Sequence, residues 1–370
     1  MKFLIATEAD DPSALLVKLA LEEEGHEVRL LFTADLPTRQ KNSIYLESGR
    51  STWVASDDLD GSIADKQYDV VWWWRGRKPF LAKEQFHPDD YHFVRRENYL
   101  FHDAIVQNIS PAAWWVNDLK AAKTVNSKLY QLKIASACGL TIPDTLVSNN
   151  PVDVRTFALK HKYKGMIYKP FCSSFWFEEG RVKISYTVSL NFSDLPANSV
   201  LQNTPGIYQQ QISKKYELRV TCFGDYLIAA RLDSQQHADG KIDWRAIPDG
   251  QMSVEPYELP ASIADKIRQF MRKTGLVFGS LDFIVSTEGE YIFLEVNEQG
   301  QFLWLEQYNA EFNMLDTFVN FLTQKSENFT WNMAKKEHKM AAYQDKIQPI
   351  LKHNMEHHVN LNNEHYWMAQ

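Results

Sequence analysis

Leu281-Asp282-Phe283 and, a short distance further on, Phe293-Leu294-Glu295-Val296-Asn297 decide the fold. Each stretch predicts an apolar strand, and the turn-forming residues 286–290 between them predict a hairpin. Side chains alternate along a strand, so Glu295 and Asn297 point to one face, and Asp282 joins them from the neighbouring strand. Three hard oxygen ligands without Cys or His are typical of Mg²⁺. Magnesium held this way usually carries substrate phosphates, so the hairpin indicates a nucleotide-using enzyme.

The composition sets the broad class. The chain has 370 residues, 44% of them hydrophobic and 24% charged, which is ordinary for a globular protein with two or three domains. A net charge of −7 gives no basic field for nucleic acid. Cys138, Cys172 and Cys222 are widely spaced and odd in number, which indicates a reducing compartment without a disulfide framework. No apolar run reaches the roughly 18 residues of a membrane helix, so we expect a cytoplasmic protein without a membrane partner.

The first part of the chain has the pattern of a β-α-β unit. Strands are predicted at 3–6, 28–32 and 68–74, with a helix at 12–24 that Gly25 ends. The continuous apolar character of the strands is typical of a parallel, doubly covered sheet. The sequence therefore predicts a small α/β domain, with a short strand at 43–46 in an otherwise polar excursion.

Trp72-Trp73-Trp74 closes the third of these strands. Such a run is compatible with a stacking platform for nucleic acid or sugar, but the alternation of a strand favours packing. Arg75 and Arg77 follow at the carboxyl end of the strand, where α/β sheets place ligands, so contact with peptide or phosphate is an open alternative.

The rest of the chain mixes helices and strands. We expect four segments: an N-terminal α/β domain over 1–115, a central and lid part over 116–205, a second part with the metal site over 206–323, and a polar, His-rich, helical tail over 324–370. The predicted helices cover 118–139, 152–160, 262–274 and 312–322, and the predicted strands cover 145–148, 166–170, 206–212, 218–223 and 226–234.

Two lysines have the spacing of a phosphate grip. Lys169 ends an apolar strand, a position that places an ammonium group at a cleft, and Lys128 lies on the preceding helix. Two separated lysines can hold the phosphates of a nucleotide from different sides. The alternative for Lys128 is an ordinary solvated helix lysine. After Lys169 comes a segment with Ser173 and Ser174, whose hydroxyls and amides could cover phosphates as a lid; its alternative is a plain hairpin.

Further polar residues follow a strand end. The backbone at Gln210, Gln211 and Ile212 can hydrogen-bond the edge of an adenine, and Glu217 can hold ribose hydroxyls. Arg219 and Arg231 lie on successive antiparallel strands, and both can face the metal cluster, where a guanidinium suits carboxylate or phosphate. The alternative for each arginine is a surface ion pair.

In this order, Lys128, Lys169, the 209–212 hinge, Glu217-Leu218-Arg219, Arg231, Asp282 and Glu295-Val296-Asn297 resemble the ATP-grasp superfamily. The resemblance covers residues 118–322 and implies an ATP-grasp fold of the α/β (α+β) class, with the front end as a pre-grasp domain. Within the superfamily, the chain looks most like the graspetide (microviridin-type) maturases of ribosomal peptides. The matching residues are Tyr168-Lys169-Pro170, Ser174-Phe175-Trp176, Leu218-Arg219-Val220-Thr221, Asp243-Trp244-Arg245 and the run 295–306.

The resemblance implies a ligase that uses ATP and Mg²⁺, with two ions. It would activate Asp or Glu side chains of a precursor peptide, comprising leader and core, as acyl phosphates, and then form ester or amide crosslinks. Mg²⁺ on Asp282, Glu295 and Asn297 would neutralise the phosphates. Arg219 and Arg231 would orient the acceptor carboxylate. The resemblance also implies a homodimer and a hairpin over 181–191 near the leader.

Three other interpretations remain open. One is a RimK-like ligase that adds amino acids to a protein or peptide, and another is an ATP-binding regulator without catalysis. The third is a metal site at His353-Asn354-Met355-Glu356-His357, which spells the inverted zinc-peptidase pattern but sits in a polar tail.

Overall fold

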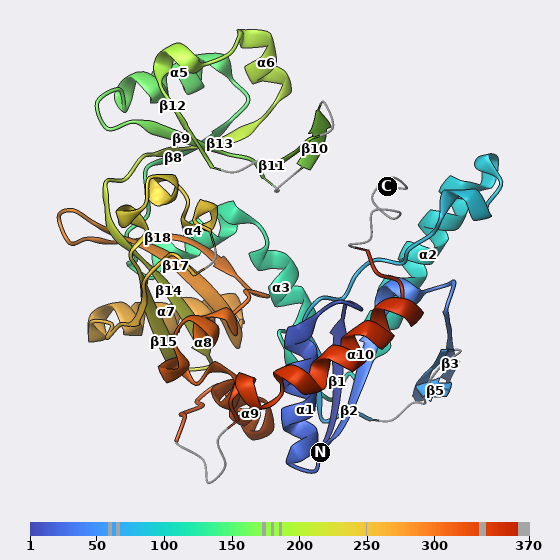
Figure 1. The fold of residues 1–370 in the computed structure, drawn as a ribbon. Helices are drawn as coiled ribbons and strands as arrows, with labels where there is room; N and C mark the ends of the chain where they lie inside the picture. The colour runs from blue at the N-terminus through green and yellow to red at the C-terminus, as the bar shows by residue number, and fades with distance from the viewer. Residues whose placement is uncertain are drawn as a thin grey trace. The chain divides into compact units, whose positions relative to one another are not determined.

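A computed structural model gives the fold and describes residues 1–57, 61–63, 67–171, 175–178, 181–184, 187–248, 250–332 and 338–361 (Figure 1). The chain forms two compact units. The first, the N-terminal unit, contains residues 1–119 and 313–370, and the second, the central unit, contains residues 120–312. Residues 313–370, expected as the end of one domain and a separate tail, thus fold with the N-terminal unit. No helix among the described residues is long and apolar enough to cross a membrane.

The N-terminal unit is built on a parallel sheet with the strand order β2-β1-β6-β7. Helix α1 connects its first two strands, which confirms the β-α-β prediction. Asp11 caps this helix by accepting a hydrogen bond from the Ser13 amide at 2.9 Å, and Pro12 occupies the first helical position. The elements of this sheet are β1 (Lys2–Thr7), α1 (Pro12–Glu23), β2 (Glu27–Phe32), β6 (Val70–Trp73) and β7 (Trp114–Val116).

The tryptophans of β6 are core residues. Trp72 and Trp74 are each 1% exposed, and the Trp72 ring meets Phe318 edge-on with centroids 4.7 Å apart. The packing interpretation is therefore confirmed. Arg75 and Arg77 both form ion pairs with Glu8, so their guanidinium groups are engaged at the end of the sheet.

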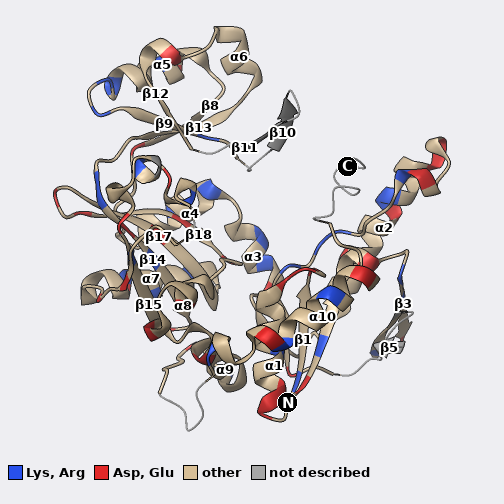
Figure 2. Cartoon of the chain, viewed as in Figure 1, with Lys and Arg blue, Asp and Glu red and all other residues tan. Residues whose placement is uncertain are grey.

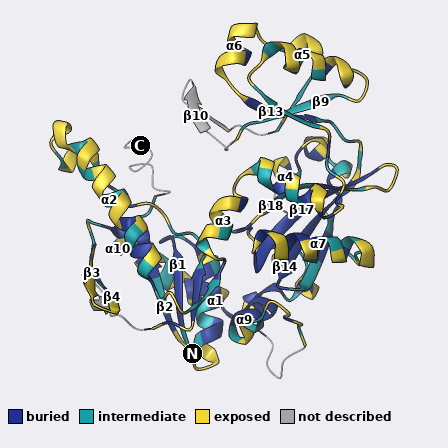
Figure 3. Ribbon diagram, turned by 180° about the vertical axis from the view of Figure 1, so that it is seen from behind, coloured by how far each residue is buried: buried dark blue, intermediate teal, exposed yellow. Residues whose placement is uncertain are grey.

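The N-terminal unit also contains a second, antiparallel sheet and a long helix. The sheet consists of β3 (Gln40–Glu47), β4 (Arg50–Asp57) and β5 (Gly61–Ile63), so the strand predicted at 43–46 is real but longer. Helix α2 (Pro88–Asn108) was not predicted. It carries charges of both signs (Figure 2), and its N-terminal part is largely exposed (Figure 3).

The C-terminal segment is fastened to the N-terminal unit by buried polar contacts. Helix α9 (Met314–Gln324) and helix α10 (Gln344–His357) both contact α1, and α10 lies within the segment for which a helical tail was predicted. His338 is hydrogen-bonded to Tyr343 at 2.6 Å and to Glu24 at 3.0 Å. His358 contacts Asp35 at 2.6 Å.

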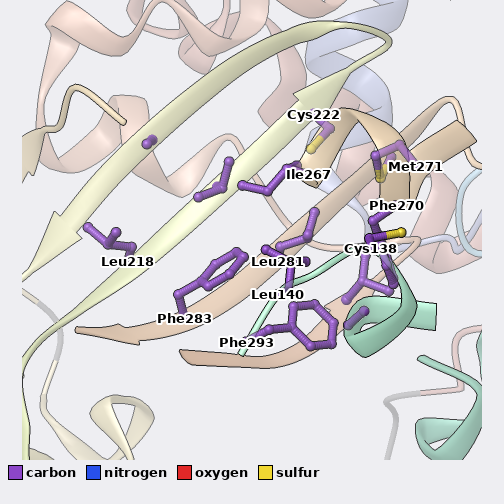
Figure 4. Close-up of a cluster of buried hydrophobic side chains, with 14 of the residues drawn as sticks. Cys138, Leu140, Leu218, Cys222, Ile267, Phe270, Met271, Leu281, Phe283 and Phe293 are labelled. Atoms are coloured by element: carbon purple, nitrogen blue, oxygen red, sulfur yellow. The ribbon is translucent and has the colours of Figure 1, made fainter. Parts of the chain in front are cut away.

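The central unit contains the larger antiparallel sheet, with the order β16-β15-β14-β17-β18. One face of this sheet packs on α4 and α7 through a cluster of apolar side chains that includes Leu218, Leu281, Phe283, Phe293 and Phe270 (Figure 4). Replacing one of these phenylalanines by alanine is expected to cost about 3–5 kcal/mol. The elements are β14 (Lys214–Phe223), β15 (Tyr226–Leu232), β16 (Val254–Pro256), α7 (Ala261–Thr274), β17 (Phe278–Ser286), β18 (Tyr291–Asn297) and α8 (Trp304–Tyr308).

A smaller sheet in the same unit has the order β12-β9-β13-β8. Residues 181–184 do not form a hairpin with 188–191 as expected, because β11 pairs with β10 and β12 joins β9. The elements are β8 (Thr145–Ser148), α5 (Pro151–Lys160), β9 (Met166–Lys169), β10 (Phe175–Glu178), β11 (Arg181–Ile184), β12 (Val188–Leu190), α6 (Asn198–Asn203) and β13 (Gly206–Gln210).

The helix predicted over 118–139 is two helices, α3 (Leu119–Val125) and α4 (Lys128–Ala137). The break has a clear cause. The Ser127 hydroxyl accepts a hydrogen bond from the Tyr130 amide, so Ser127 caps a new helix. Lys128 is therefore the first residue of α4 rather than a residue in the middle of a long helix.

Short 3₁₀ turns lie between these elements. In the N-terminal unit they are Thr33–Asp35, Lys83–Gln85 and Met340–Ala342, and in the central unit Phe192–Asp194, Ser234–Gln236, Asp239–Lys241, Trp244–Ala246 and Ala310–Phe312.

Candidate active site

The β17–β18 hairpin places the predicted carboxylates opposite each other. Asp282 pairs with Glu295 in the strand register, and the register shifts immediately after this pair. Leu294 is the extra residue, so Leu294 and Glu295 both line one cavity while Phe293 and Val296 face the apolar core. A β-bulge of this kind re-aims side chains beside functional sites.

Glu295 lies among three cations. Its carboxylate forms an ion pair with Lys128, and its side chain is 22% exposed. Burial alone would raise the pKa of Glu295, but the charges of Lys128, Lys169 and Arg245 outweigh it and lower the pKa to about 2. Glu295 is therefore an anion at every physiological pH.

Lys169 stands at the end of β9, where the sequence predicted it, and lines the same cavity. Burial lowers its pKa, and the positive charges of Lys128 and Arg245 lower it further. Glu295 and Asp243 act in the opposite direction. A lysine destabilised by neighbouring cations gains from any added anion, which is the property of a phosphate ligand.

Asp282 is held by Arg219. One guanidinium nitrogen donates to both carboxylate oxygens of Asp282 at 2.8 and 3.0 Å, and the other donates to the Gln301 carbonyl at 3.2 Å. The buried Nε of Arg219 has no hydrogen-bond partner among the described residues. Gly300 allows the backbone to pass close to Arg219 and Ser280. A Cβ at this position would lie 2.9 Å from the Arg219 guanidinium and 2.7 Å from the Ser280 Cβ. The run 295–306 thus positions Arg219.

Asn297 is less engaged. Its side chain is exposed, and its Oδ1 accepts a hydrogen bond from the Gln299 amide at 3.0 Å. It lines a second hollow with Lys128, Lys169, Arg245 and Glu295, whereas Asp282 lines the first cavity. Glu295 belongs to both.

These residues fit a hard divalent cation. No cluster of three His, Cys, Asp or Glu side chains capable of holding a metal forms within the described ranges, so a site here rests on two carboxylates and one amide oxygen. Each of the two carboxylates forms an ion pair with a basic residue of the site: Asp282 with Arg219, and Glu295 with Lys128. Oxygen-only donors of this kind match Mg²⁺, which takes a few protein oxygens together with phosphates.

The hinge differs in detail from its prediction. The amides of Gln210 and Gln211 donate to the carbonyls of Asp144 at 2.9 Å and Gly165 at 3.0 Å, so neither amide is available to a base. The side chains or backbone of Gln210, Gln211 and Ile212 do line the cavity. Within the described residues, no backbone hydrogen bond engages the Ile212 amide.

Glu217 lines the first cavity, whereas Lys128 lines the second hollow. The Lys214 ammonium and the Ser234 hydroxyl donate to the same carboxylate oxygen of Glu217, at 3.0 and 2.8 Å. Burial raises the pKa of Glu217, and Lys214 and Ser234 oppose this effect. The geometry is compatible with the second oxygen accepting from ribose hydroxyls.

Arg231 does not face the metal cluster, which corrects the prediction. It pairs with Leu218, and register partners on adjacent strands share a face. Leu218 belongs to the apolar core, so Arg231 lies on the face opposite Asp282. Its guanidinium stacks over Tyr216 at 4.5 Å and forms an ion pair with Asp233.

Arg245 is the site residue that the sequence analysis did not assign. The Nε and one terminal nitrogen of Arg245 donate hydrogen bonds to the Asp243 carboxylate at 2.8 and 2.9 Å. This ion pair raises the pKa of Arg245, although burial lowers it. Trp244 stacks on Trp304 with centroids 5.2 Å apart, which fixes the Asp243–Arg245 turn beside the cavity. The motif was recognised, but nothing in a loop sequence says which strand end the loop crosses. Ser173 and Ser174 lie outside the described residues.

The first cavity is lined by residues of β9, β13, β14 and the β17–β18 hairpin. Its wall runs from the hinge at Gln210 through Glu217 to Asp282, Glu295 and Lys169. Apolar side chains such as Ile167, Ile212 and Ile284 line the same cavity as these polar and charged groups.

Comparison with known proteins gives a consistent result. Neither a family model nor a curated protein matches the chain. Solved structures do. A RiPP-associated ATP-grasp ligase from Chryseobacterium gregarium, in complex with ADP and a leader and core peptide, is 28% identical over 88% of this chain and 97% of its own, with a TM-score of 0.79. Macrocyclase MdnC from Microcystis aeruginosa MRC, bound with precursor peptide MdnA, is 28% identical over 88% and 100% of the two chains, with a TM-score of 0.77.

Macrocyclase MdnB from the same strain is 27% identical, covers 87% of this chain and 98% of its own, and has a TM-score of 0.72. These matches extend over both units of the chain rather than the central unit alone. The chain has the ATP-grasp fold, and it is similar to the RiPP-associated ligases with that fold.

Proposed function

We propose that this protein uses ATP to join carboxylate side chains of a precursor peptide to hydroxyl or amine groups of the same peptide. In the first step a carboxylate oxygen attacks the γ-phosphorus, the bond to the β–γ bridging oxygen breaks, and ADP leaves. In the second step the hydroxyl or amine attacks the acyl carbon, loses its proton, and inorganic phosphate leaves. The product is an ester or amide crosslink.

The observation that carries this proposal is the setting of Glu295 beside Lys128, Lys169 and Arg245, at the border of the first cavity. A carboxylate that attacks ATP is an anion approaching an anion, and the reaction needs positive charge that is already in place. Asp282, Glu295 and Asn297 would hold Mg²⁺, which would supply positive charge for the phosphoryl transfer.

The lysines exchange partners when the nucleotide binds. In the structure Lys128 neutralises Glu295. With MgATP bound, Lys128 and Lys169 would hold phosphate oxygens, and Glu295, Asp282 and Asn297 would hold the cation. The ion pair keeps both side chains in place beforehand, which reduces the reorganisation that binding requires.

The arginines handle the peptide. Arg245 borders both hollows, and its guanidinium presents a planar fork that suits the acceptor carboxylate. Arg219, fixed by Asp282 and the Gln301 carbonyl, supplies the remaining positive charge near the acyl carbon. Because Arg231 lies on the opposite face, it has no direct part in this proposal.

Residues of the cavity wall also provide binding groups for the nucleoside part of ATP. The Ile212 amide and a hinge carbonyl bind the adenine edge, and the outer oxygen of Glu217 binds ribose hydroxyls. Ser173 and Ser174 remain proposed as lid residues over the phosphates.

The proteins of similar structure support a peptide as the substrate. The Chryseobacterium ligase is in complex with a leader and core peptide, and MdnC is bound with its precursor peptide. Fold alone would not decide, since D-cycloserine synthetase DcsG shares it with a TM-score of 0.53 at 15% identity. Addition of free amino acids and nucleotide binding without catalysis are therefore the alternatives to test.

The test combines the purified protein with ATP, Mg²⁺ and a peptide from a short neighbouring reading frame that contains repeated Ser, Thr or Lys and Asp or Glu. Mass spectrometry should show the loss of one water per ring, together with one ADP per ring. A gain of amino-acid mass would instead support the amino-acid-adding alternative, and ADP without either product would contradict both. Glu290→Gln, an exposed carboxylate change on the same hairpin, is the control for folding.

Two attributes accompany this proposal. We propose a homodimer, and a cytoplasmic location, where the buried thiols of Cys138 and Cys222 stay reduced. The functional division at 115, 205 and 323 also remains a proposal, within the two units that the structure defines.

A further inference from the structure

A β-bulge at the start of β14 turns Lys214 toward the first cavity. In regular alternation Lys214 would share the face of Tyr216 and Leu218, which both belong to the apolar core. The register with β17 shifts between Lys214 and Tyr216, so Lys215 is the extra residue of the bulge. Lys214 therefore lines the first cavity together with Glu217, while Lys215 is exposed.

The Lys214 ammonium lies between two acceptors from separate parts of the chain. It donates to the Glu217 carboxylate at 3.0 Å and to the Ile242 carbonyl at 2.7 Å. The side chains of Lys214 and Glu217 are only 8% and 7% exposed, so little water is present to replace either bond. The position of the Ile242 carbonyl is therefore tied to that of the Glu217 carboxylate.

A second chain of hydrogen bonds leads from Glu217 to the neighbouring carbonyl. The Ser234 hydroxyl donates to Glu217 at 2.8 Å, through the same carboxylate oxygen that Lys214 contacts. The Gln235 amide nitrogen contacts the Ser234 hydroxyl at 3.3 Å and the Lys241 carbonyl at 3.4 Å. Two consecutive carbonyls of this loop are thus connected to one carboxylate oxygen.

The loop held in this way carries Arg245. Asp243 follows Ile242 directly and caps the short turn Trp244–Ala246. The Asp243 carboxylate accepts from the Arg245 amide at 3.1 Å as well as from the Arg245 guanidinium. The backbone and the side chain of Arg245 are therefore both fixed to the residue after Ile242, so a displacement of Ile242 displaces the guanidinium.

We propose that Lys214 is a positioning residue that makes the binding of the peptide carboxylate at Arg245 depend on the ribose bound at Glu217. This inference rests on the proposed function, which assigns the ribose hydroxyls to Glu217 and the acceptor carboxylate to Arg245. It adds that the two sites are energetically coupled, and that Lys214 transmits the coupling.

The coupling follows from the two oxygens of the Glu217 carboxylate. A ribose hydroxyl that donates to one oxygen prevents the carboxylate from turning about its terminal torsion, which is otherwise broad. The other oxygen then keeps Lys214 in place, and Lys214 keeps the Ile242 carbonyl in place. Without the ribose hydroxyls the loop loses this support, and Arg245 spends less time in the position that receives the peptide.

Peptide affinity in two matched nucleotide complexes tests the coupling. The probe is a fluorescent peptide that contains only the Asp- and Glu-bearing core of the peptide used in the crosslinking test. Fluorescence anisotropy measures its affinity in saturating ADP with Mg²⁺, and in saturating 2′,3′-dideoxy-ADP with Mg²⁺. These nucleotides differ only in the ribose hydroxyls, and neither has a γ-phosphate to transfer. The wild type should bind the peptide about tenfold more tightly with ADP.

Variants assign this difference to Lys214. Lys214→Met should lower peptide affinity with ADP and abolish the difference between the two nucleotides. Lys214→Met/Glu217→Gln leaves no unpaired charge in the buried site and should also show no difference, so a folding defect of the single variant does not imitate the result. Lys215→Met removes the exposed neighbouring lysine and should retain the difference of the wild type. A lysine with a purely structural role would weaken binding by the same factor with both nucleotides.

Equal peptide affinities of the wild type with the two nucleotides would overturn the proposal. So would a tenfold difference that persists in Lys214→Met. Crosslinking by a wild type that shows equal affinities would leave the ligase function standing without the coupling. A coupling that depends on Lys214 in a protein that forms no crosslink would contradict the ligase function alone, because the ADP complexes require no catalysis.

Discussion

The two units of this protein both bury carboxylates, but the groups that surround these carboxylates differ. In the N-terminal unit Asp35 and Asp316 are 1% and 0% exposed, and their oxygens are filled by donors from the C-terminal segment. Asp35 accepts from the Val359 amide at 2.7 Å and contacts His358, and Asp316 accepts from the Trp331 indole at 2.9 Å and the His338 amide at 3.0 Å. In the central unit Glu295 borders a cavity and lies among more cations than it can neutralise.

The difference separates structural charge from functional charge. A carboxylate whose donors are complete contributes to the fold and has no capacity for a ligand. A carboxylate with surplus cations around it leaves a field that only an added anion satisfies. If this comparison is right, substitutions in the central unit change catalysis with little loss of stability, and substitutions in the N-terminal unit do the reverse.

The largest expected effect is on catalysis. Glu295→Gln or Asp282→Asn should lower peptide crosslinking by at least about 10³-fold, since each removes a charge that the phosphoryl transfer requires. Steady-state ADP release with peptide measures this. Glu290→Gln should keep full activity, and retention of activity by Glu295→Gln would refute the metal assignment.

Lys128→Met should reduce turnover by about 10²-fold and weaken ATP binding, because its ammonium group faces Glu295 at the phosphate end. Lys133 on the same helix is exposed, and Lys133→Met is the matched control. Titration calorimetry with a non-hydrolysable ATP analogue gives the affinities. Equal affinities for the two variants would show that Lys128 is an ordinary surface lysine.

The converse substitution destabilises the N-terminal unit. Asp316→Ala leaves the Trp331 indole and the His338 amide without their acceptor and should cost about 2–4 kcal/mol of unfolding free energy. Urea denaturation measures the loss. The folded variant should bind the ATP analogue as the wild type does; a large loss of affinity without a loss of stability would invert the comparison.

Gly300→Ala should have an intermediate effect, lowering crosslinking about tenfold. The added Cβ would press on the Arg219 guanidinium and on Ser280, so Arg219 would shift while Asp282 and Glu295 remain. A change in the KM for peptide without a change in ATP affinity is expected. Wild-type kinetics would show that Arg219 tolerates displacement.

The smallest effect is a pH dependence of the nucleotide-free protein. The pKa of Glu295 is lowered from 4.5 to about 2, so this carboxylate stabilises the fold above about pH 4.5, and the contribution is lost as the pH falls through about 2. The difference in unfolding free energy between wild type and Glu295→Gln, with chelator present, should be about 1 kcal/mol smaller at about pH 3.5 than at about pH 6. A constant difference would mean that the three cations do not act on Glu295.

The sequence carried more information on the catalytic hairpin than on what surrounds it. Alternation predicts the face of Asp282, because its neighbours Leu281 and Phe283 are both core residues, but the bulge at Leu294 interrupts that alternation just before Glu295. Arg231 was placed on the wrong face because its strand, Tyr226–Leu232, is apolar on both sides and shows no alternation. Arg245 lies in a loop, where no period links sequence to position.

The prediction of helices was limited in the same way by the local sequence pattern. Helix α2 was missed because only three of its residues are buried, so it lacks the apolar stripe by which a helix is recognised. The break before α4 was visible in principle, since Ser127 is a typical N-cap residue. The fastening of the C-terminal segment depends on contacts such as His358 with Asp35, which no local pattern predicts.

The most direct test of the central claim follows oxygen atoms. A substrate peptide whose Asp and Glu carboxylates are labelled with heavy oxygen is incubated with the protein, ATP and Mg²⁺, and the released phosphate is analysed by mass spectrometry. The account predicts one labelled oxygen in phosphate for each crosslink formed, because the carboxylate oxygen attacks the γ-phosphorus and leaves with it. Crosslinked peptide accompanied by unlabelled phosphate would contradict activation through an acyl phosphate.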